Sequence, residues 1–358
     1  MPVQEDVDVL VLGAGPAAAA AGIHLRRAGA DVALVDRART TARRPREVVT
    51  APTLRALRAL GVATAPEGAL PCRGLLALWD GSEQFHDYAL VQCESAHALE
   101  PRALQQRLLA SAEAMGIRTH LAGALKTRWA DGAWEVDLRS AGGHRRIRSR
   151  SLFLAAGRSC ASLLVQGQGR CHFDRQVALT LIVRRSGAHD DVLVVEAAPS
   201  GWWYAAPSKG REGEIVLLTD SDLLPREAAA RRAFVLAQLA ATRFIEPSLE
   251  DVPAGARFTG CDARFSLATP CPAPRCYAIG DAVLALDPLS GRGLAFALES
   301  ARVAAACVGT DDHDAYADWV HARFQGEASD RLRSYSRARP SRDSTYWVRR
   351  RQERAGGT

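Results

Sequence analysis

Lysine, metal-ligand clusters and long apolar runs are scarce or missing in this chain of 358 residues. Only two of its 46 basic residues are lysines, Lys126 and Lys209, a skew toward arginine that reflects genome composition. No apolar stretch approaches the roughly 20 residues of a membrane-spanning helix, and the apolar run behind the acidic start MPVQEDVD is too short for a signal peptide. We therefore expect a cytoplasmic protein without a membrane span.

The eight cysteines are spread along the chain without a CxxC pair, and no His, Cys and Asp side chains have the spacing of metal ligands. These absences predict free thiols, no metal and no disulfide-reductase chemistry. Gly167 and Gly169 lack a strand–helix context, so a separate nicotinamide domain is not expected. The net charge of +6 is modest. We expect the arginine-rich segment 326–358 to be a solvated helix end rather than a nucleic-acid site.

The first of two glycine-rich stretches follows a short apolar strand over 7–12 and opens an alanine-rich helix. Gly13 permits a tight turn, Gly15 lets the backbone approach a pyrophosphate, and Ala18 lets the helix lie close to the strand. The helix N-terminus directs its amides at phosphates, and a second strand ends in an acid placed to bind a ribose hydroxyl. The residues predicted to hold a dinucleotide are Gly13, Gly15, Pro16, Ala17, Ala18, Asp36, Arg37 and Arg44.

The second glycine-rich stretch follows a predicted strand over 275–279. Asp281 comes directly after that strand and can accept hydrogen bonds from ribityl hydroxyls, whereas Pro288 can pack on a flavin ring edge. Glycines at the next helix start let backbone amides face the flavin pyrimidine, where negative charge collects on reduction. The two stretches together predict FAD, bound in this second half by Gly280, Asp281, Pro288, Gly291, Gly293 and Leu294.

Four segments carry a family resemblance: GAGPAA, EPRALQQRLLASAEAMG, LFLAAGRS and GDAVLALDPLSGRG. They resemble the glutathione-reductase-type FAD fold of flavoprotein monooxygenases. That class includes p-hydroxybenzoate hydroxylase, flavin-dependent halogenases and geranylgeranyl reductases. The resemblance implies that Arg102 contacts the cofactor and that Glu47 lies near it.

The predicted elements favour an α/β fold, in which a Rossmann-like FAD domain carries an inserted antiparallel-sheet substrate domain. We expect helices over 50–60, 102–115 and 225–241, a hairpin over 75–90, and a meander over 125–150 followed by a separate strand over 152–156. Strand-like runs between 177 and 219 form the inserted sheet. The expected domains are 1–74, 98–165 and 270–325 for FAD, 75–97 and 166–269 for substrate, and 326–358 as the arginine-rich segment.

The segment Trp202–Pro207, WWYAAP, tests the halogenase branch. Halogenases carry a WxWxIP motif and an early catalytic lysine, whereas here the second Trp is Tyr204, the Ile is Ala206, and no lysine precedes Lys126. SGWWYAAPS, EIVLLTDSDLL and RARPSRDSTYWVRRR are more similar to flavoprotein maturation factors that oxygenate a tryptophan during cysteine tryptophylquinone assembly. Related natural-product hydroxylases share the pattern. The resemblance implies a tryptophan in a partner protein as substrate, with the arginine-rich segment as a docking element.

The leading hypothesis is an FAD monooxygenase that hydroxylates an electron-rich aromatic ring through a flavin hydroperoxide. Trp202, Trp203 and Tyr204 either line the substrate pocket or fill the core between the lobes, and His86 is a candidate general base. Ala155–Ser159 replaces the Asp-Gly pair of single-domain hydroxylases, so either a partner flavin reductase or NAD(P)H supplies electrons. The alternatives are a natural-product hydroxylase or halogenase-like enzyme, an FAD-dependent reductase of unsaturated lipids, and a non-catalytic flavin-binding partner of an oxidase.

Overall fold

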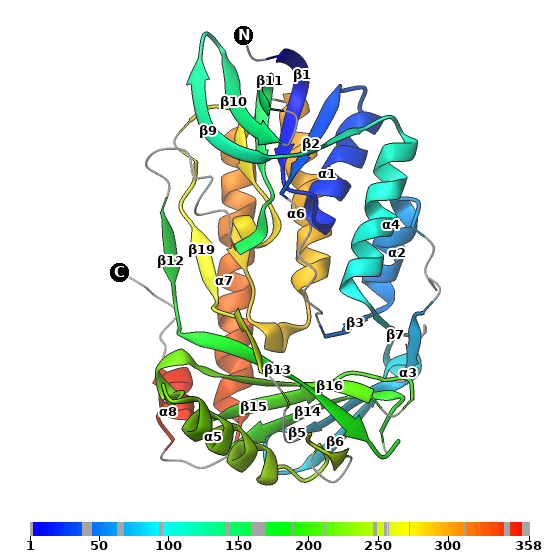
Figure 1. Cartoon of the computed structure of the whole chain (residues 1–358), viewed down its shortest axis with the longest axis vertical. Helices are drawn as coiled ribbons and strands as arrows, with labels where there is room; N and C mark the ends of the chain where they lie inside the picture. The colour runs from blue at the N-terminus through cyan, green and yellow to red at the C-terminus, as the bar shows by residue number, and fades with distance from the viewer. Residues whose placement is uncertain are drawn as a thin grey trace.

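Two β-sheets lie one above the other along the long axis of the molecule, and the helix α7 (His313–Arg337) runs from one to the other (Figure 1). This arrangement is seen in a computed structural model. It describes residues 3–37, 45–62, 68–92, 96–140, 143–158, 169–187, 189–210, 212–245, 249–253, 256, 258–271, 273–310, 312–339 and 344–352.

The first sheet has the strand order β8-β2-β1-β11-β10-β9, with β20 paired to β11. Its strands are β1 (Val3–Leu12), β2 (Val32–Asp36), β8 (Arg118–Leu121), β9 (Gly123–Ala130), β10 (Ala133–Ser140), β11 (Gly143–Leu154) and β20 (Cys276–Ala278). The strands β8, β2, β1, β11 and β20 are parallel, as expected for an α/β fold. The helices α1 (Pro16–Arg27), α4 (Pro101–Ala114) and α6 (Gly293–Thr310) pack on it.

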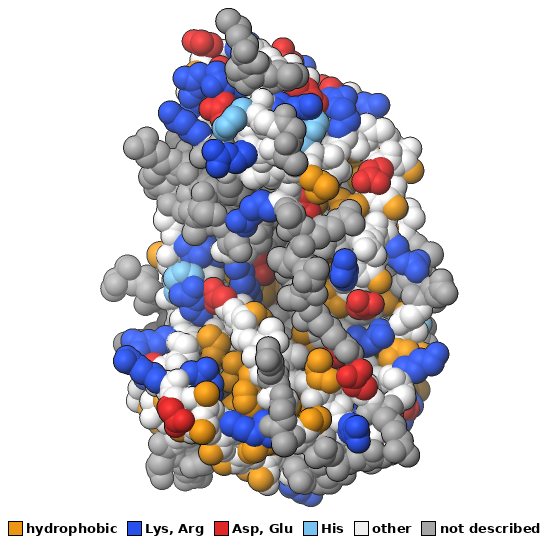
Figure 2. Space-filling model, viewed as in Figure 1, with side chains coloured by type: hydrophobic (Ala, Val, Ile, Leu, Met, Phe, Trp, Pro, Cys, Tyr) orange, Lys and Arg blue, Asp and Glu red, His pale blue; other side chains and the backbone are white. Residues whose placement is uncertain are grey.

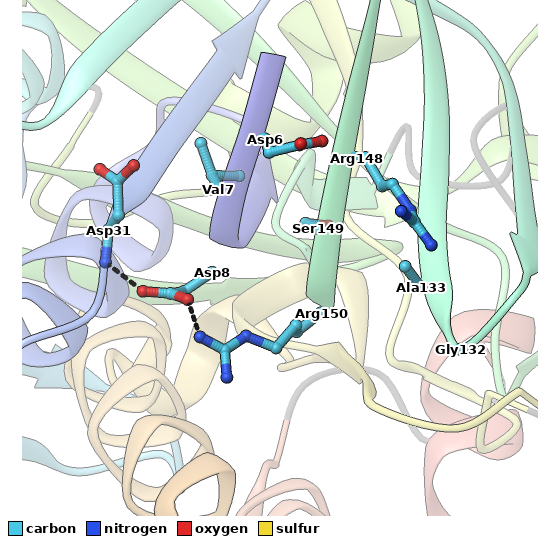
Figure 3. Close-up of a pocket in the computed structure, with 9 residues that line it drawn as sticks. All are labelled: Asp6, Val7, Asp8, Asp31, Gly132, Ala133, Arg148, Ser149 and Arg150. Atoms are coloured by element: carbon cyan, nitrogen blue, oxygen red, sulfur yellow. Dashed lines mark hydrogen bonds and ion pairs between the residues drawn. The ribbon is translucent and has the colours of Figure 1, made fainter. Parts of the chain in front are cut away.

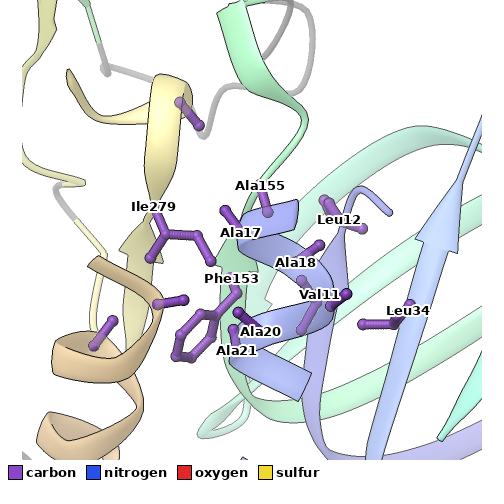
Figure 4. Close-up of a cluster of buried hydrophobic side chains, with 14 of the residues drawn as sticks. Val11, Leu12, Ala17, Ala18, Ala20, Ala21, Leu34, Phe153, Ala155 and Ile279 are labelled. Atoms are coloured by element: carbon purple, nitrogen blue, oxygen red, sulfur yellow. The ribbon is translucent and has the colours of Figure 1, made fainter. Parts of the chain in front are cut away.

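Small side chains let α1 lie close to the first sheet. Its alanines are buried; Ala17, Ala20 and Ala21 lie on the side of Phe153 of β11 and Ile279 beyond β20, and Ala18 lies beside β1 (Figure 4). A Cβ at Gly22 would lie 3.3 Å from the Ile117 side chain, so the helix could not carry a larger residue there without displacing its neighbour. Branched side chains of β1 fill the space behind the helix. This core holds the Gly13–Pro16 turn at the carboxyl edge of the sheet.

The prediction of a meander followed by a separate strand is wrong, because the two are joined. Residues 145–150 and 152–154 belong to one continuous strand, β11, which ends two residues earlier than the predicted strand over 152–156. It pairs antiparallel with β10 on one side and parallel with β1 on the other. No glycine or proline stands between the two predicted strands, and Ile147, Ser149 and Ser151 alternate as buried residues through the junction. The meander is therefore an extension of the first sheet.

The second sheet has the strand order β17-β13-β16-β15-β14-β5-β6, with β18 paired to β13. Its strands are β5 (Gly74–Leu78), β6 (Glu83–Asp87), β13 (Gln176–Arg185), β14 (Val192–Ala198), β15 (Gly201–Ala205), β16 (Glu212–Asp220), β17 (Leu249–Asp251) and β18 (Thr259–Asp262). The pairing is antiparallel except between β14 and β5, so this sheet is mixed rather than purely antiparallel. The helix α5 (Ala228–Ala240) covers its outer face.

The predicted hairpin over 75–90 ends earlier than expected. The strand β6 stops at Asp87, and α3 (Tyr88–Gln92) follows it. The carboxylate of Asp87 accepts hydrogen bonds from the amides of Ala89 and Leu90, at 2.9 and 3.2 Å. This side chain caps the first helical turn, which explains why Tyr88–Leu90 leave the strand.

Two small sheets lie between the large ones. One contains β3 (Glu47–Val49), β7 (Ala96–Leu99) and β4 (Leu70–Cys72), and the other contains β12 (Arg170–His172), β19 (Ser266–Ala268) and β21 (Leu284–Ala285). The helix α2 (Ala51–Ala59) follows β3, with Thr50 at its N-cap position. The Thr50 side chain accepts no capping hydrogen bond, so the predicted cap is positional only.

The C-terminal segment differs from the solvated helix end that we expected. After α7 the chain forms α8 (Thr345–Gln352), in which Tyr346, Trp347 and Arg350 are buried. The Trp347 indole donates a hydrogen bond to the carbonyl of Ala198 on the second sheet, at 2.8 Å. Aromatic side chains among the arginines therefore dock α8 on the sheet, a packing that charge counting did not reveal.

By length and composition alone, α6 passes the test for a membrane-spanning helix, with a mean hydropathy of 1.2. It is the one helix among the described residues to do so. Its 18 residues pack against α1 and α7. A core helix of a folded domain has the same composition, so this finding is weak evidence for a membrane span.

Candidate functional site

The two glycine-rich stretches emerge side by side from the first sheet. Leu12 at the end of β1 is paired with Leu154 of β11, and Leu154 is paired with Ala278 of β20. Because parallel strands end at the same edge, the loops after β1 and β20 begin at the same level. A Cβ at Gly280 would lie 3.0 Å from the Ala17 side chain, so the second loop touches the start of α1. The structure thus joins the two predicted halves of the site.

Gly13 and Gly15 have different roles in the first loop. Gly13 has φ +135°, and a Cβ there would lie 2.6 Å from the carbonyl carbon of Ala155. A glycine is therefore needed at position 13 for two reasons: the turn is tight, and the loop passes close beside the end of β11. A Cβ at Gly15, the N-cap of α1, would have no protein atom within 4 Å. The space beside Gly15 fits a pyrophosphate that approaches the first amides of the helix.

The helix α4 supports the first loop through a residue that the sequence analysis missed. The Gln105 side chain donates a hydrogen bond to the carbonyl of Ala14, at 2.8 Å. Arg102, the predicted cofactor contact, is exposed in the first turn of the same helix, three residues earlier. A spacing of three places both residues on one helix face, so the motif around Arg102 did contain a signal for Gln105.

The predicted ribose-binding and adenine-flanking residues lie at or beyond the end of β2. Asp36 is the last residue of that strand and is half-buried. Arg37 follows it and is exposed, whereas Arg44 lies outside the described residues. Asp36 therefore has the position at the end of the second strand that a ribose ligand requires.

In the second loop, Asp281 has a protein partner that the sequence analysis did not foresee. Its carboxylate accepts a hydrogen bond from Arg158 Nε at 3.1 Å, and Arg158 also bonds the carbonyl of Leu286 at 3.2 Å. The amide of Gly280 donates to Ser300 Oγ of α6, at 2.9 Å. Arg158 belongs to the stretch in which we noted only a missing Asp-Gly pair. It ties the end of β11 to the loop that holds Asp281.

The turn at Pro288 corrects one prediction. Pro288–Ser290 form a 3₁₀ turn, η5, and Gly291 ends it in the left-handed conformation with φ +60°. The Gly291 amide donates to the carbonyl of Pro288 at 3.0 Å, so it is used within the turn instead of facing a flavin. Gly293 and Leu294 begin α6, where the first amides have no preceding carbonyl to bond. These two positions fit the predicted role beside a flavin pyrimidine.

Of the three predicted aromatic pocket residues, Trp202 and Trp203 are core side chains. Trp203 lies in the cluster under α5, and Trp202 donates a hydrogen bond to the hydroxyl of Tyr335 on α7, at 3.1 Å. Both indoles are at most 1% exposed. Tyr204 is half-buried and lies on the same face of β15 as Trp202. Only Tyr204 among the three therefore keeps a surface that a substrate could contact.

Glu47 lies close enough to Tyr204 to act on it. The pKa of the Tyr204 phenol is raised above its ordinary value, first by burial and then by the negative charge of Glu47, with Glu214 contributing in the same direction. Glu47 begins β3, which lies between the two large sheets (Figure 1). The negative charge of Glu47, at the start of β3, therefore acts on the hydroxyl of Tyr204 on the second sheet.

His86 does not have the position that we predicted for a general base. It lies on β6, the last strand of the second sheet, and its side chain is exposed. The order of the sheet places β6 at an edge, where it pairs with β5 and is separated from β13 by β5, β14, β15 and β16. We find no contact between His86 and either glycine-rich loop among the described residues.

Apart from the glycine-rich loops, the molecule has charged and apolar surface patches and a surface hollow. Hydrophobic side chains gather on the lower half of the visible face, over the second sheet, whereas Lys and Arg predominate at its upper end (Figure 2). A shallow hollow of about 400 Å³ lies beside the start of β1, lined by Asp6, Asp8, Arg148 and Arg150 among others (Figure 3). It is at the opposite end of β1 from Gly13 and so is separate from the glycine-rich loops. Among the described residues no group of His, Cys, Asp and Glu could hold a metal ion.

A buried carboxyl group below the second loop should make stability depend on pH. The pKa of Asp174 is raised to about 6, chiefly by burial; Arg331 and Arg350 lower it, and Asp287 raises it further. Unfolded Asp titrates near 3.8, so the native state binds more protons between those values. The free energy of unfolding should therefore fall as the pH rises from about 4 to about 6, by at most about 3 kcal/mol, and show no further change from this group above that range.

Urea unfolding between pH 4 and pH 7 measures this effect. The variant Asp174→Asn keeps the acceptor for the Gln176 amide but cannot ionise, so its slope between pH 4 and 6 should be flatter than that of the unmodified protein. An unchanged slope in the variant would assign the effect to other carboxyl groups.

Comparisons with known proteins agree with this geometry. A family model described as an FAD binding domain matches residues 6–307. LodB of Marinomonas mediterranea, by name an FAD-dependent oxidoreductase, is 25% identical over 362 residues, which cover 97% of each chain. The peptidyl tryptophan dihydroxylase QhpG shares the fold at 22% identity, with a TM-score of 0.78 over 96% of this chain and 78% of its own. The myxobacterial halogenase CndH does so at 17% identity, with a TM-score of 0.81 and coverages of 97% and 86%.

The cofactor and the enzyme class follow from these matches and from the loops described above. The cofactor is FAD, and the protein is an FAD-dependent oxidoreductase. The fold is the mixed α/β fold of FAD monooxygenases, with a parallel core sheet and a second sheet beside it. Since the matched region spans most of its length, the chain belongs to the family described as the FAD binding domain.

Proposed function

We propose that this FAD-dependent oxidoreductase is a monooxygenase that hydroxylates a tryptophan side chain of a partner protein. The observation that carries this proposal is the likeness along nearly the whole chain to QhpG, which is described as a peptidyl tryptophan dihydroxylase essential for tryptophylquinone cofactor biogenesis. The 25% identity to LodB over 97% of both chains supports the same class of oxidoreductase.

The space between the lobes suits an aromatic substrate. Tyr204 projects from β15 beside Val195 and Val216, its neighbours on the adjoining strands. Val216 is buried, but the half-buried Val195 side chain gives an indole ring an apolar surface to pack on, and Glu47 and Glu214 are near enough for their charges to act on the Tyr204 hydroxyl. The substrate N–H would find an acceptor there without competing water.

Bound FAD supplies the activation of molecular oxygen when it is reduced. The residues of the chain have the other tasks. The amides at Gly293 and Leu294 bind the flavin end that gains negative charge, and Tyr204 orients the ring to be oxidised. Glu47 holds a proton acceptor near the Tyr204 hydroxyl, which stays protonated because its pKa is raised. Electrons come from a flavin reductase or from NAD(P)H, in a cytoplasmic setting.

The lysine positions disfavour halogenation, despite the structural likeness to CndH. Lys126 lies on β9, the outermost strand of the first sheet. Lys209 is exposed in the turn before β16. Neither amine is on the strand that carries Tyr204, so the described residues offer no lysine beside the proposed substrate surface.

Incubation of the reduced holoprotein with a tryptophan-containing partner peptide and oxygen tests the proposal. Mass spectrometry should show the gain of oxygen atoms on tryptophan, with oxygen consumed in proportion. An FAD-dependent reductase of unsaturated lipids would instead turn over without oxygen, and that result would replace the proposal. Reoxidation that no aromatic substrate changes would favour a non-catalytic flavin-binding role.

Replacement of Tyr204 tests the substrate surface. In Tyr204→Phe the ring remains but one hydrogen bond to the substrate side is lost, so we expect kcat/KM to fall about tenfold. FAD content should not change, because the hydrogen bonds that hold the described parts of the two glycine-rich loops come from other side chains, such as Gln105, Arg158 and Ser300. The control is Tyr88→Phe on α3, which directly follows β6 of the second sheet, because Tyr88 is half-buried like Tyr204. Equal kcat/KM in both variants would remove Tyr204 from the site.

A further inference from the structure

The turn that begins α6 is tied to α7 at both ends. Arg331 of α7 donates through Nε to the carboxylate of Asp287, at 2.8 Å, just before Pro288. At the other end Arg292 donates to Glu327 and Asp330 of α7, both at 2.8 Å. The arginine belongs to α7 at the first end and to the turn at the second end. The segment 287–292 is thus held against α7 by two charged contacts.

The Arg331 contact is the stronger candidate for control of the turn. The side chains of Arg331 and Asp287 are 7% and 4% exposed, whereas that of Arg292 is 41% exposed and screened by water. Arg331 also bonds Asp174 at 2.8 Å, so its guanidinium bridges two buried carboxylates. The fixed fork of an arginine suits this bridge in a way that a lysine ammonium does not.

Asp287 transmits this contact to the backbone of the turn. Its Oδ2 accepts from Arg331, while its Oδ1 accepts from the Leu289 amide at 2.9 Å and from the Tyr335 hydroxyl at 3.3 Å. The carboxylate therefore cannot rotate without losing the cap of the 3₁₀ turn at Pro288. The turn lies directly before Gly293 and Leu294, whose amides at the start of α6 would bind the flavin.

The same network reaches the second sheet. The Tyr335 hydroxyl also accepts from the Trp202 indole, two residues before Tyr204 on β15, and bonds Gln176 of β13 at 3.3 Å. Tyr346 donates to the same Gln176 oxygen at 2.8 Å. The turn beside the flavin and the strand that carries Tyr204 are thereby connected through buried side chains of α7 and α8.

We propose that Arg331 is a positioning residue, which fixes the flavin-binding turn 287–292 relative to the second sheet and sets the charge beside the flavin. Removal of its guanidinium leaves Asp174 and Asp287 without their shared cation. The turn should lose its fixed geometry, and excess negative charge should disfavour the reduced flavin. The proposal rests on FAD binding and not on the identity of the substrate.

The test compares Arg331→Met with Arg333→Met, a matched change at an exposed arginine two residues further along α7. FAD affinity is measured by fluorescence titration of the apoprotein, the midpoint potential of the bound FAD by dye equilibration, and stability by thermal unfolding of the apoprotein. We expect Arg331→Met to raise the Kd for FAD roughly tenfold or more and to make the midpoint potential more negative. Arg333→Met should change neither.

Arg331→Lys provides the second variant, because it keeps a positive charge but cannot bridge both carboxylates with the same geometry. We expect a Kd between those of the unmodified protein and Arg331→Met. An unchanged Kd and midpoint potential in Arg331→Met would overturn the proposal, even if the apoprotein unfolded at a lower temperature. If Arg331→Met is insoluble, unchanged values in Arg331→Lys would overturn it.

Discussion

Gly13→Ala is expected to abolish FAD binding and to lower the free energy of unfolding by about 4 kcal/mol. The backbone at Gly13 has φ +135°, a region that an L-residue adopts only with strain, and the new methyl group would collide with the end of β11 at Ala155. Strain in this region costs about 1–3 kcal/mol, and an added methyl in a packed site costs a similar amount. Relief requires that the first loop move away from β11, and the loop would then no longer fit a pyrophosphate.

Gly15→Ala is the matched control for that prediction. Gly15 has an ordinary φ of −74°, and its Cβ would meet no protein atom within 4 Å. The variant should therefore fold with nearly unchanged stability but bind FAD more weakly, because the methyl group occupies the approach of the pyrophosphate. Chemical unfolding of the apoprotein and FAD titration separate the two effects. Gly15→Ala with unchanged FAD affinity would show that the pyrophosphate does not pass this residue.

Arg350→Met is expected to lower the free energy of unfolding by about 3 kcal/mol, because it removes the buried one of the two arginines that bind Asp220 and leaves that carboxylate only the bond from the partly exposed Arg349, at 3.0 Å. Arg350 bonds both oxygens of Asp220, at 2.6 and 3.2 Å, and both side chains are 1% exposed. Its guanidinium also lies 4.2 Å from the centre of the Tyr346 ring. Undocking of α8 would expose the Asp220 carboxylate to water and so relieve its weakened pairing, and α8 should therefore become more susceptible to proteolysis.

A double-mutant cycle with Asp220→Asn distinguishes this loss from simple removal of packing. The double variant has no buried carboxylate charge at position 220, so it should be more stable than Arg350→Met alone. Arg146→Met, at a solvent-exposed pair with Asp137, should change stability little. If the double variant is no more stable than Arg350→Met, the loss comes from packing of the arginine side chain.

Much of the first lobe was predictable from short stretches of sequence. The β-branched run of β1, the small residues of α1 and the acid at the end of β2 lie within one window of about 30 residues, and each reports its own backbone conformation. The loop around Gly280 was identifiable in the same way. The cofactor followed from the two stretches taken together.

The errors occurred where a neighbour distant in sequence decides the outcome. Trp202 and Trp203 alternate along a strand, but only the packing of α5 on one face and of Tyr335 on the other buries both of them. Asp281 follows the strand β20 closely, as its sequence context predicts, but its partner Arg158 lies 123 residues away. The arginine-rich segment looked solvated because the burial of Arg350 depends on Asp220, 130 residues earlier.

Local chemistry of the chain alone determined the strand–glycine–helix turn, the FAD cofactor and the α/β class, because backbone geometry and periodicity are properties of neighbouring residues. Tertiary structure alone decided that Gly280 meets Ala17, that the charge of Glu47 acts on Tyr204, and that Arg331 joins Asp287 to Asp174. These contacts link residues far apart in the sequence, and their partners are selected by how sheets and helices pack, which no local pattern records.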